Sequence, residues 1–424
     1  MITVGFAGMT HLGINSAVAT AARGFNVLGF DHDAAVIERL TRHEIPIVEP
    51  DLDALVAENA KRLRFSAKPA DLAACDIVYI AADVPTDDHG KSNLAPIRDL
   101  ITSVIKQMND KALLVVLCQV PPGFTRSLTT IPHDRLYYQV ETLIFGRAVD
   151  RALNPERFIV GCAAPESLIE PRFKAVLEAF KCPILPMRYE SAELAKISIN
   201  FCLVASVTVA NTLAEVSEAI GADWSEIAPA LKLDKRIGPF SYLTPGLGIS
   251  GGNLERDLRT VLDIAETKHT DTGMIEAWIS NSQYRKDWCW RTLETYALKA
   301  NPKARVAVLG LAYKENTAST KNSPSLLLLS HLERGDVCVH DPVVAPSIVP
   351  FAKSAGSALA CAEGADVLVL ATPWPEYKTL AIADLAKAMR GRLIIDPYRL
   401  LNGPAAAKAG FAYHTLGMPP LTAS

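Results

Sequence analysis

Three polar side chains close a glycine-rich stretch in the middle of the chain. The stretch, Leu243-Thr-Pro-Gly-Leu-Gly-Ile-Ser-Gly-Gly-Asn-Leu-Glu-Arg-Asp257, ends with Asn253, Arg256 and Asp257. Glycine is used where the backbone takes a positive φ or approaches another group closely. The pattern indicates a loop that wraps a ligand and delivers these side chains to a reacting centre. In isolation, an ordinary Gly/Pro turn between two helices explains the same pattern.

Lys196 and Asn200 are a second pair of candidate groups, and they lie in a long apolar segment. Residues 193–216 contain neither proline nor glycine and are too many for a strand, which predicts a long, mostly buried helix. The two side chains are four positions apart and therefore project from one face of it. Two polar groups on one face indicate a site, although a solvent-edge pair near the helix start is an alternative for Lys196.

A dinucleotide-binding turn is predicted at the N-terminus. A strand over residues 2–7 leads into Gly8-Met-Thr-His-Leu-Gly13, and the next strand, after an alanine-rich helix, ends at Asp31. In this layout the helix N-terminus faces the pyrophosphate, and the acidic residue binds the ribose hydroxyls. Asp31 without a neighbouring arginine favours NAD over NADP. Thr10 replaces the second glycine and could crowd the phosphates, so a βαβ unit that binds no nucleotide stays open.

Strand-like and helical runs alternate at both ends of the chain, which predicts an α/β fold with parallel sheets. We expect three domains, at residues 1–188, 189–300 and 301–424. The expected strands cover residues 2–7, 26–30, 76–81, 112–117 and 158–161, and then 306–310, 337–340, 366–371 and 393–396. A helical region is expected over 257–298, and the tail after Gly410 is expected to be loosely ordered.

The composition describes a soluble, multidomain globular chain. It has 424 residues, 49% of them hydrophobic, and a formal net charge of −3. The charge favours neither nucleic acid nor an anionic membrane as a partner. We find no signal peptide and no apolar run long enough to span a bilayer. The eight cysteines are scattered without metal-ligand spacing, which predicts reduced thiols in a cytoplasmic protein and no metal site.

Short motifs along nearly the whole chain resemble, in order, those of the UDP-glucose/GDP-mannose dehydrogenase family. Besides the segments above, they are Ile45-Pro-Ile-Val-Glu-Pro50, Val84-Pro-Thr86, Val120-Pro-Pro-Gly123, Glu141-Thr-Leu, Asn154-Pro-Glu-Arg-Phe-Ile-Val-Gly161, Arg236-Ile-Gly238, Gly310-Leu-Ala-Tyr-Lys314, Ser323-Pro324 and Asp341-Pro342. The spacing from Glu141 to Gly161 is more similar to UDP-glucose dehydrogenases than to the N-acetylhexosamine branch. The resemblance implies two Rossmann-like domains joined by a long central helix, through which two copies form a homodimer.

The family oxidises the C6 alcohol of a nucleotide sugar twice with two NAD+, and the second oxidation passes through a cysteine thioester. By position, the resemblance implies that Lys196 stabilises the oxyanion with Asn200 beside it, that Asp257 orients or activates water, and that Glu141 holds a water. The residues implied for NAD are Gly8, Thr10, His11, Leu12, Gly13, Asp31, Val84, Pro85, Thr86 and Lys321. Those implied for the UDP-sugar are Arg236, often reaching across a dimer interface in this family, with Tyr242, Leu243, Gly246, Gly248 and Lys314.

The chain departs from the family at the nucleophile. Asn253 stands at the cysteine position, and because an amide nitrogen is a poor nucleophile, the covalent route is closed. Arg256 replaces a lysine and cannot donate a proton near neutral pH. Gln119, in a Cys118-Gln119 pair, replaces a hydroxyl, and Lys321 replaces an arginine. Several changes around one reaction indicate that the reaction itself has changed.

Three functions are compatible with these residues. The first is an NAD-dependent oxidation at C6 of a UDP-hexose, UDP-glucose favoured, that stops at the aldehyde or oxidises its hydrate, with Asn253 stabilising that species by hydrogen bonds. The second is an NAD-dependent epimerisation without net oxidation. The third is a catalytically silent homologue that binds nucleotide sugar or an active paralogue. By analogy with the family, the context is polysaccharide biosynthesis.

Overall fold

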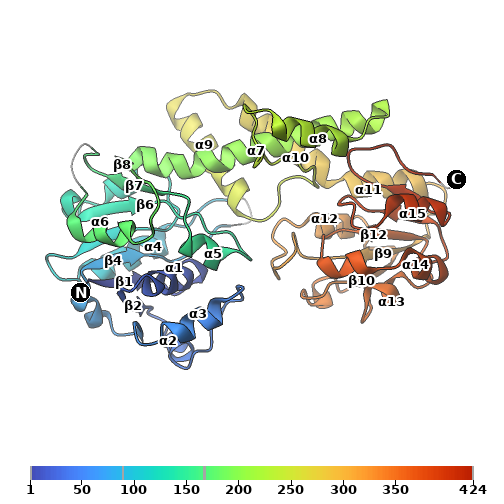
Figure 1. Cartoon of the computed structure of the whole chain (residues 1–424). Helices are drawn as coiled ribbons and strands as arrows, with labels where there is room; N and C mark the ends of the chain where they lie inside the picture. The colour runs from blue at the N-terminus through green and yellow to red at the C-terminus, as the bar shows by residue number, and fades with distance from the viewer. Residues whose placement is uncertain (1, 88–89, 166–168, 423–424) are drawn as a thin grey trace. The chain divides into compact units, whose positions relative to one another are not determined.

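The computed structural model describes residues 2–87, 90–165 and 169–422 and divides into two compact units, Met1–Ile199 and Asn200–Ser424. Each unit contains its own sheet (Figure 1). Helix α7 (Tyr189–Ile220) begins in the first unit and continues into the second. The predicted α/β fold, with two parallel-sheet domains and a long central helix, is confirmed.

The first unit is an eight-stranded sheet in the order β3-β2-β1-β4-β5-β6-β7-β8. The strand order reverses at β1 and β4, so the carboxyl ends of these neighbours flank the crevice in which doubly wound sheets bind ligands. The strands are β1 (Thr3–Ala7), β2 (Asn26–Phe30), β3 (Leu63–Ser66), β4 (Ile77–Ile80), β5 (Leu113–Val116), β6 (Leu136–Gln139), β7 (Phe158–Cys162) and β8 (Ile184–Arg188).

Helices enclose this sheet, because strands such as β4 and β5 are apolar and buried along their whole length. The helices are α1 (His11–Ala22), α2 (Ala34–Thr41), α3 (Leu52–Glu58), α4 (Ala95–Ile105), α5 (Ala148–Leu153) and α6 (Pro171–Glu178), with short 3-10 turns η1 (Pro69–Ala74), η2 (Thr125–Ser127) and η3 (His133–Arg135). Helix α1 is alanine-rich and buried on most of its surface, as expected of the first crossover.

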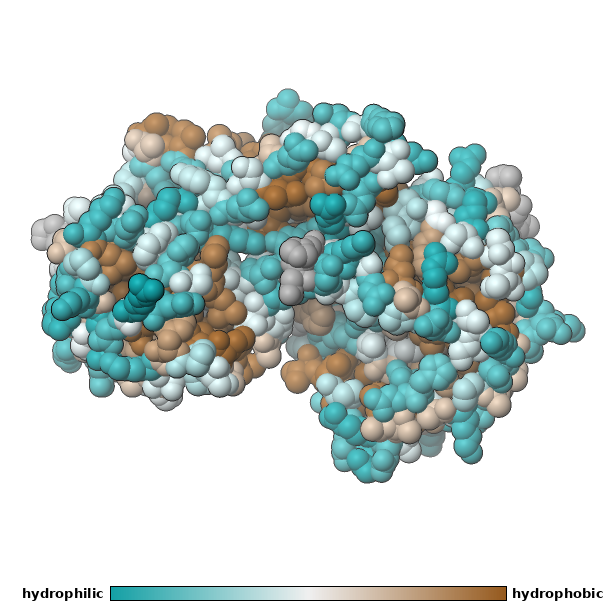
Figure 2. Space-filling model, turned by 180° about the vertical axis from the view of Figure 1, so that it is seen from behind, coloured by the Kyte–Doolittle hydropathy of each residue, from teal (hydrophilic) through white to brown (hydrophobic). Residues whose placement is uncertain are grey.

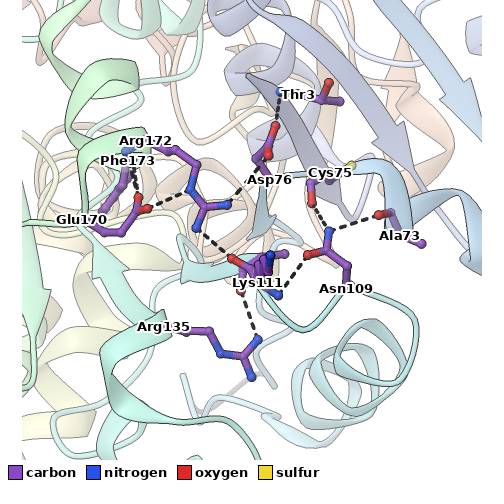
Figure 3. Close-up of polar contacts among 11 residues, drawn as sticks. Thr3, Ala73, Cys75, Asp76, Asn109, Lys111, Arg135, Glu170, Arg172 and Phe173 are labelled. Carbon is purple, nitrogen blue, oxygen red and sulfur yellow. Dashed lines mark hydrogen bonds and ion pairs between the residues drawn. The ribbon is translucent and has the colours of Figure 1, made fainter. Parts of the chain in front are cut away.

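A polar network joins the amino ends of β1, β4 and β5 (Figure 3). One Asp76 oxygen accepts the Thr3 backbone N–H at 2.8 Å, and the other faces Arg172 at 3.7 Å. Arg172 also pairs with Glu170 at 2.7 Å, while the Asn109 amide donates to the Cys75 carbonyl at 2.9 Å. The network lies at the strand ends opposite the ligand edge, so we assign it a structural role.

The second unit has a six-stranded parallel sheet in the order β11-β10-β9-β12-β13-β14. Its strands are β9 (Arg305–Leu309), β10 (Asp336–His340), β11 (Lys353–Ser354), β12 (Val367–Leu370), β13 (Leu393–Ile395) and β14 (Ala412–His414). Its helices are α8 (Trp224–Leu233), α9 (Asn253–Lys268), α10 (Gly273–Lys286), α11 (Trp288–Leu293), the π-helix η4 (Glu294–Leu298), α12 (Pro324–Ser330), α13 (Ala358–Ala362), α14 (Ile382–Ala388) and α15 (Gly403–Lys408), with 3-10 turns η5 (Pro346–Ile348) and η6 (Pro375–Thr379).

Several sequence-based expectations are corrected by the structure. The tail after Gly410 is not loose, because β14 extends the second sheet and Tyr413 is buried. The first sheet is not wholly parallel, since β6 pairs antiparallel with β7. By contrast, the helical region expected over 257–298 is confirmed, as the successive helices α9, α10, α11 and η4. Finally, α7 is not mostly buried, because only 28% of its apolar 18-residue stretch is buried, and it is long and apolar enough to cross a membrane. This is weak evidence for a membrane span, because helices of soluble proteins pass the same test.

Candidate active site

The turn after β1 has the geometry of a phosphate cradle. Gly8 has a φ of +100°, and a Cβ at Gly13 would lie 1.8 Å from the Gly8 carbonyl oxygen, so position 13 admits only glycine. Asp31, at the end of β2, accepts the Met9 backbone N–H at 2.7 Å and the Asp33 N–H at 2.9 Å. The predicted turn residues therefore come together at the ligand edge of the sheet.

Thr10 does not block this turn. Its backbone is extended, with φ −87° and ψ −171°, so the position does not require glycine. Its hydroxyl accepts the Asp83 backbone N–H at 3.0 Å and faces the Ala81 carbonyl at 3.4 Å. The side chain is thus directed at the end of β4 rather than across the helix N-terminus, and the cradle fits a dinucleotide.

Glu49 is a buried residue of this site to which the sequence reasoning assigned no role, although it lies in the quoted Ile45–Pro50 motif. It accepts the Gly146 N–H at 2.8 Å and the Ala148 N–H at 3.1 Å, and contacts the His11 ring at 2.7 Å. The Phe145 ring packs on His11 with centroids 4.2 Å apart. Glu49 therefore fixes the first residue of α1, while Leu12 beside it is buried in the core.

The Val84-Pro85-Thr86 segment follows β4 and begins a small antiparallel pairing, with Thr86 opposite Ser92. The Pro85 carbonyl accepts the Asn93 N–H at 2.8 Å. Val84 is half-buried against the core. The segment lies on the β4 side of the crevice, one residue beyond Asp83.

The start of α7 is anchored to the first unit by its own side chains. Glu193 is fully buried and accepts the backbone N–H groups of Gly123 at 2.6 Å and Thr125 at 2.8 Å. Burial raises the pKa of this carboxyl group, and the hydrogen bonds partly oppose that rise. The Tyr189 hydroxyl donates to the Leu136 carbonyl at 2.7 Å. These contacts position the next helical turn, which carries Lys196.

Lys196 forms an ion pair with Glu141 at 2.9 Å, and both side chains are largely buried. The second Glu141 oxygen accepts the Leu143 N–H at 2.9 Å, which fixes the carboxylate. A cation held in this way can stabilise a developing alkoxide, and a fixed carboxylate can hold or deprotonate a water. Gln119, just after β5, is half-buried.

In the second unit, Asp257 is held by two side chains. The Asn200 amide donates to one carboxylate oxygen, and Arg256 Nε lies 3.4 Å from the other. All three residues are buried, and Asp257 is only 1% exposed. Asn200 lies one turn beyond Lys196 on α7, as the four-residue spacing predicts.

Asn253 is the first residue of α9, at the end of the glycine loop, and it is exposed. Gly251 has a φ of +78°, and a Cβ there would lie 3.0 Å from the Tyr313 ring, so this loop position also needs glycine. The Gly251 N–H donates to the Lys321 carbonyl at 3.1 Å, and the Asn322 amide donates to the Gly251 carbonyl at 3.1 Å. Lys321 and Asn322, in the segment that follows Lys314, therefore hold this part of the loop by hydrogen bonds.

Three helices hold the earlier part of the glycine loop. The Trp224 indole donates to the Leu243 carbonyl at 2.7 Å, the Asn211 amide accepts the Gly246 N–H at 2.8 Å, and the Ser282 hydroxyl accepts the Ile249 N–H at 2.7 Å. At Gly248, which has φ +74°, a Cβ would lie 2.4 Å from the Ser282 carbonyl oxygen. The loop is rigidly supported rather than a bare turn.

A pocket of about 610 Å³ opens beside this loop within the second unit. Its volume is in the range of small-molecule sites. Leu243 is the one predicted substrate residue in the lining, together with Trp224, Ser225, Ala228, Pro229, Lys232, Thr244, Pro245, Glu315, Pro373, Lys378, Pro397, Tyr398, Arg399, Leu400 and Leu416. Arg399, to which the sequence analysis assigned no role, pairs with Asp223 at 2.7 Å and has a positive φ of 53°.

The remaining predicted substrate residues lie outside this lining. Arg236 is exposed and pairs with Asp234 at 2.6 Å. Tyr242 is half exposed, and Lys314 lies 5.7 Å from the Tyr313 ring. Lys321, which was predicted to bind NAD, packs its side chain near Gly252 in the second unit.

The thiol of Cys118 offers no nucleophile at this site. Cys118, beside Gln119, is fully buried, and burial raises the pKa of its thiol to about 12, so it stays protonated. All eight cysteines are free. Within the described ranges, no group of three or more His, Cys, Asp and Glu side chains is placed to hold a metal ion.

Comparison with known proteins identifies three successive regions. The profiles of the UDP-glucose/GDP-mannose dehydrogenase family match residues 2–180 as its NAD binding domain, 190–283 as its central domain and 307–403 as its UDP binding domain. Similar curated proteins include UDP-glucose 6-dehydrogenase TuaD of Bacillus subtilis, 28% identical over 97% of this chain and 92% of the relative. Another is UDP-glucose 6-dehydrogenase of Pseudomonas aeruginosa, 28% identical over 97% and 96%.

Solved structures show the same fold. A UDP-glucose dehydrogenase from Pyrobaculum islandicum is 25% identical with a TM-score of 0.81, over 93% of this chain and 94% of that one. A UDP-D-ManNAc dehydrogenase from Pyrococcus horikoshii is 24% identical with a TM-score of 0.84, over 98% and 99%. The predicted family resemblance and NAD-binding domain are therefore confirmed. The chain belongs to the UDP-glucose/GDP-mannose dehydrogenase family.

Proposed function

We propose that this chain is a cytoplasmic, NAD-dependent dehydrogenase acting at C6 of a UDP-hexose, with UDP-glucose as the first candidate. The observation that carries the proposal is the Lys196–Glu141 ion pair at 2.9 Å, together with Asp257 held by Asn200 and Arg256. Relatives that match nearly the whole chain are named UDP-glucose 6-dehydrogenases, which supports the substrate.

Within this proposal, Lys196 stabilises the alkoxide at C6, and Glu141 takes the proton directly or through a water. NAD+ bound at Gly8–Gly13 and Asp31 would supply the acceptor for the oxidation. Asp257 orients the water of a later step, since its hydrogen bond from Asn200 fixes the carboxylate. These groups are sufficient for one alcohol oxidation.

The second oxidation is where this chain departs from its family. Asn253 at the start of α9 cannot form a thioester, but its amide can hydrogen-bond an aldehyde or its hydrate. Arg256 is committed to Asp257 and supplies charge without proton transfer. We therefore expect the aldehyde to be the principal product, with slow oxidation of the hydrate.

The pocket beside the glycine loop fits the UDP end of such a substrate. Lys232, Lys378 and Arg399 supply positive charge for a diphosphate, while Tyr398 and Leu243 provide apolar surface for a base. Helix α7 and the boundaries 1–188, 189–300 and 301–424 complete the three-domain arrangement that we propose. Homodimerisation is part of the same proposal, with Arg236 available to a second copy because it is exposed.

Single-turnover absorbance of NADH tests this function, with excess NAD+ and a panel of UDP- and GDP-hexoses. We expect one NADH per active site with UDP-glucose and an aldehyde trapped by a hydrazine. Two NADH would show that Asn253 supports a non-covalent second oxidation. No NADH with any sugar, despite binding shown by thermal stabilisation, would overturn the dehydrogenase in favour of an epimerase or a silent binding protein.

A further inference from the structure

A carboxylate of the protein itself faces the dinucleotide cradle. Asp83 follows β4, the sheet neighbour of β1, and its backbone N–H donates to the Thr10 hydroxyl at 3.0 Å. The two residues lie at the carboxyl ends of the two strands between which the strand order reverses. In doubly wound folds, this crevice receives the cofactor.

The Asp83 carboxyl group reaches donors at the N-terminus of α1. The Thr10 side chain and the backbone amide of Leu12, in the first turn of that helix, lie close enough to this carboxyl group to lower its pKa by hydrogen bonding. Desolvation in the crevice raises the pKa of the carboxyl group, and these hydrogen bonds act in the opposite direction, although the residue as a whole is exposed. Amides at a helix N-terminus are the donors that a pyrophosphate uses.

The other acidic groups around the turn have different partners. Glu49 is occupied by Gly146, Ala148 and the His11 ring. Asp31 accepts the Met9 and Asp33 amides at the ribose end, and Glu141 pairs with Lys196. Of these four acids, Asp83 is the one whose carboxyl group lies beside the Leu12 amide of α1.

We propose that Asp83 and Thr10 form a specificity-determining pair that sets the affinity of this chain for NAD. The Asp83 carboxylate competes with the cofactor pyrophosphate for the amide donors of α1, and the Thr10 hydroxyl holds the Asp83 loop in the competing position. The threonine that replaces glycine therefore acts through this loop and not by crowding the phosphates. This inference rests on the use of NAD in the proposed function, but not on the sugar or on the number of oxidations.

The test is the dissociation constant of NAD+ for the full-length protein, measured by titration calorimetry without sugar. Asp83→Asn removes the negative charge, and we expect it to tighten NAD+ binding by about tenfold at low salt, with a smaller gain at high salt. Thr10→Gly should tighten NAD+ binding as well. The double variant should gain less than the product of the two effects, because both substitutions release one contact.

Two controls make the result specific. Asp53→Asn, an exposed acid on α3, should leave NAD+ binding unchanged. Adenosine, which lacks phosphate, should bind equally to the wild type and to Asp83→Asn, and melting temperatures should show that all variants fold. NAD+ binding that is unchanged or weakened in Asp83→Asn would overturn the proposal. Weaker binding would mean that Asp83 helps to hold the cofactor.

The outcomes also separate this inference from the proposed function. NAD+ binding that responds to Asp83 without NADH formation from any UDP-hexose would support the pair and overturn the dehydrogenase. NADH formation together with NAD+ binding that does not respond to Asp83→Asn would support the dehydrogenase and overturn the Asp83–Thr10 pair. Absence of NAD+ binding in the wild type and all variants would overturn both.

Discussion

In the function that we propose, the side chain at position 253 decides how far the oxidation can proceed. The first residue of α9 lies in the positive end of a helix dipole, which would stabilise a thiolate. The amide found there gains nothing as a nucleophile from that field. It keeps the ability to donate a hydrogen bond to an oxyanion, which favours electrostatic over covalent assistance.

A thiol introduced at position 253 should therefore allow the second oxidation. We expect Asn253→Cys to convert the product from aldehyde to acid, with two NADH per sugar in a single turnover, because a thiolate at this position can form the thiohemiacetal. Mass spectrometry of the sugar product and NADH absorbance measure the change. Asn253→Ser is the matched control, since its hydroxyl is not ionised at neutral pH. Unchanged products in a folded variant that binds both ligands would count against the site as drawn.

Lys196 is expected to act on the transition state more than on binding. Replacing it with Met removes the cation from a largely buried pair, and kcat should fall by about 10²- to 10³-fold, the usual loss for an oxyanion donor. The dissociation constant of UDP-glucose should change much less. Lys268→Met, at the end of α9, is the control. If KM rises while kcat stays unchanged, Lys196 acts in substrate binding instead.

At the scale of elements, the apolar patterns predicted what burial dictates. The strands β1, β2, β4, β5 and β7 are continuous and largely apolar runs, which made them predictable. Helix α7 was predictable because its segment lacks proline and glycine. The strands that were missed, β3, β6, β8, β11 and β14, are short or carry polar residues, such as Arg64 in β3. Their strand state comes from pairing with neighbours already in the sheet, which local sequence does not encode.

The candidate site divides in the same way. The Lys196–Asn200 spacing and the glycine turn follow from helix and turn geometry, so sequence reasoning could find them. Glu49, Asp83 and Arg399 could not be found, because their partners are distant in sequence, such as Gly146 for Glu49 and Asp223 for Arg399. Only folding brings these groups together.

The two sheets share a device that links consecutive strand ends. Asp341, after β10, accepts the backbone N–H groups of Leu311 at 2.6 Å and Ala312 at 3.1 Å in the turn after β9, as Asp31 accepts Met9 in the first sheet. Val343, Val344 and the Trp374 indole also donate to Asp341. Burial raises the pKa of Asp341, but these hydrogen bonds outweigh it and hold the pKa below its usual value.

Asp341→Asn should destabilise the second sheet by roughly 2–3 kcal/mol, because an amide has one acceptor oxygen for donors that now share two. Since the folded pKa is lowered, the stabilisation is present above the unfolded pKa of about 3.9 and is lost as pH falls through the folded pKa. Urea denaturation at pH 7 and pH 4 measures this difference. Asp384→Asn, an exposed acid on α14, is the control. A difference that grew on acidification would contradict the assignment.

At the scale of the whole molecule, several large apolar side chains of the second unit are exposed. They belong to the far half of α7, to α8 and to the segment before the glycine loop, and their exposed fractions include 72% for Ile220, 85% for Leu233 and 91% for Phe240. Figure 2 shows brown, hydrophobic patches among the hydrophilic residues on one face of the molecule. Such patches on soluble proteins mark association sites.

A second copy of the chain is the partner we expect on this surface. A stable interface hides about 800 Å² on each side, with large apolar residues at its centre, so Leu233→Ser combined with Phe240→Ser should shift a dimer to monomer in light-scattering chromatography. Val48→Ser, at a residue of the first unit that is 96% exposed, should leave the dimer intact. If the dimer places Arg236 near the substrate of the other copy, the monomeric variant should also bind UDP-glucose about tenfold more weakly, as expected for the loss of one charge-assisted contact to a phosphate.

Dissociation of the dimer without any change in UDP-glucose affinity would show that Arg236 does not contact the substrate of the other copy. A wild type that is monomeric at all concentrations would contradict the homodimer itself.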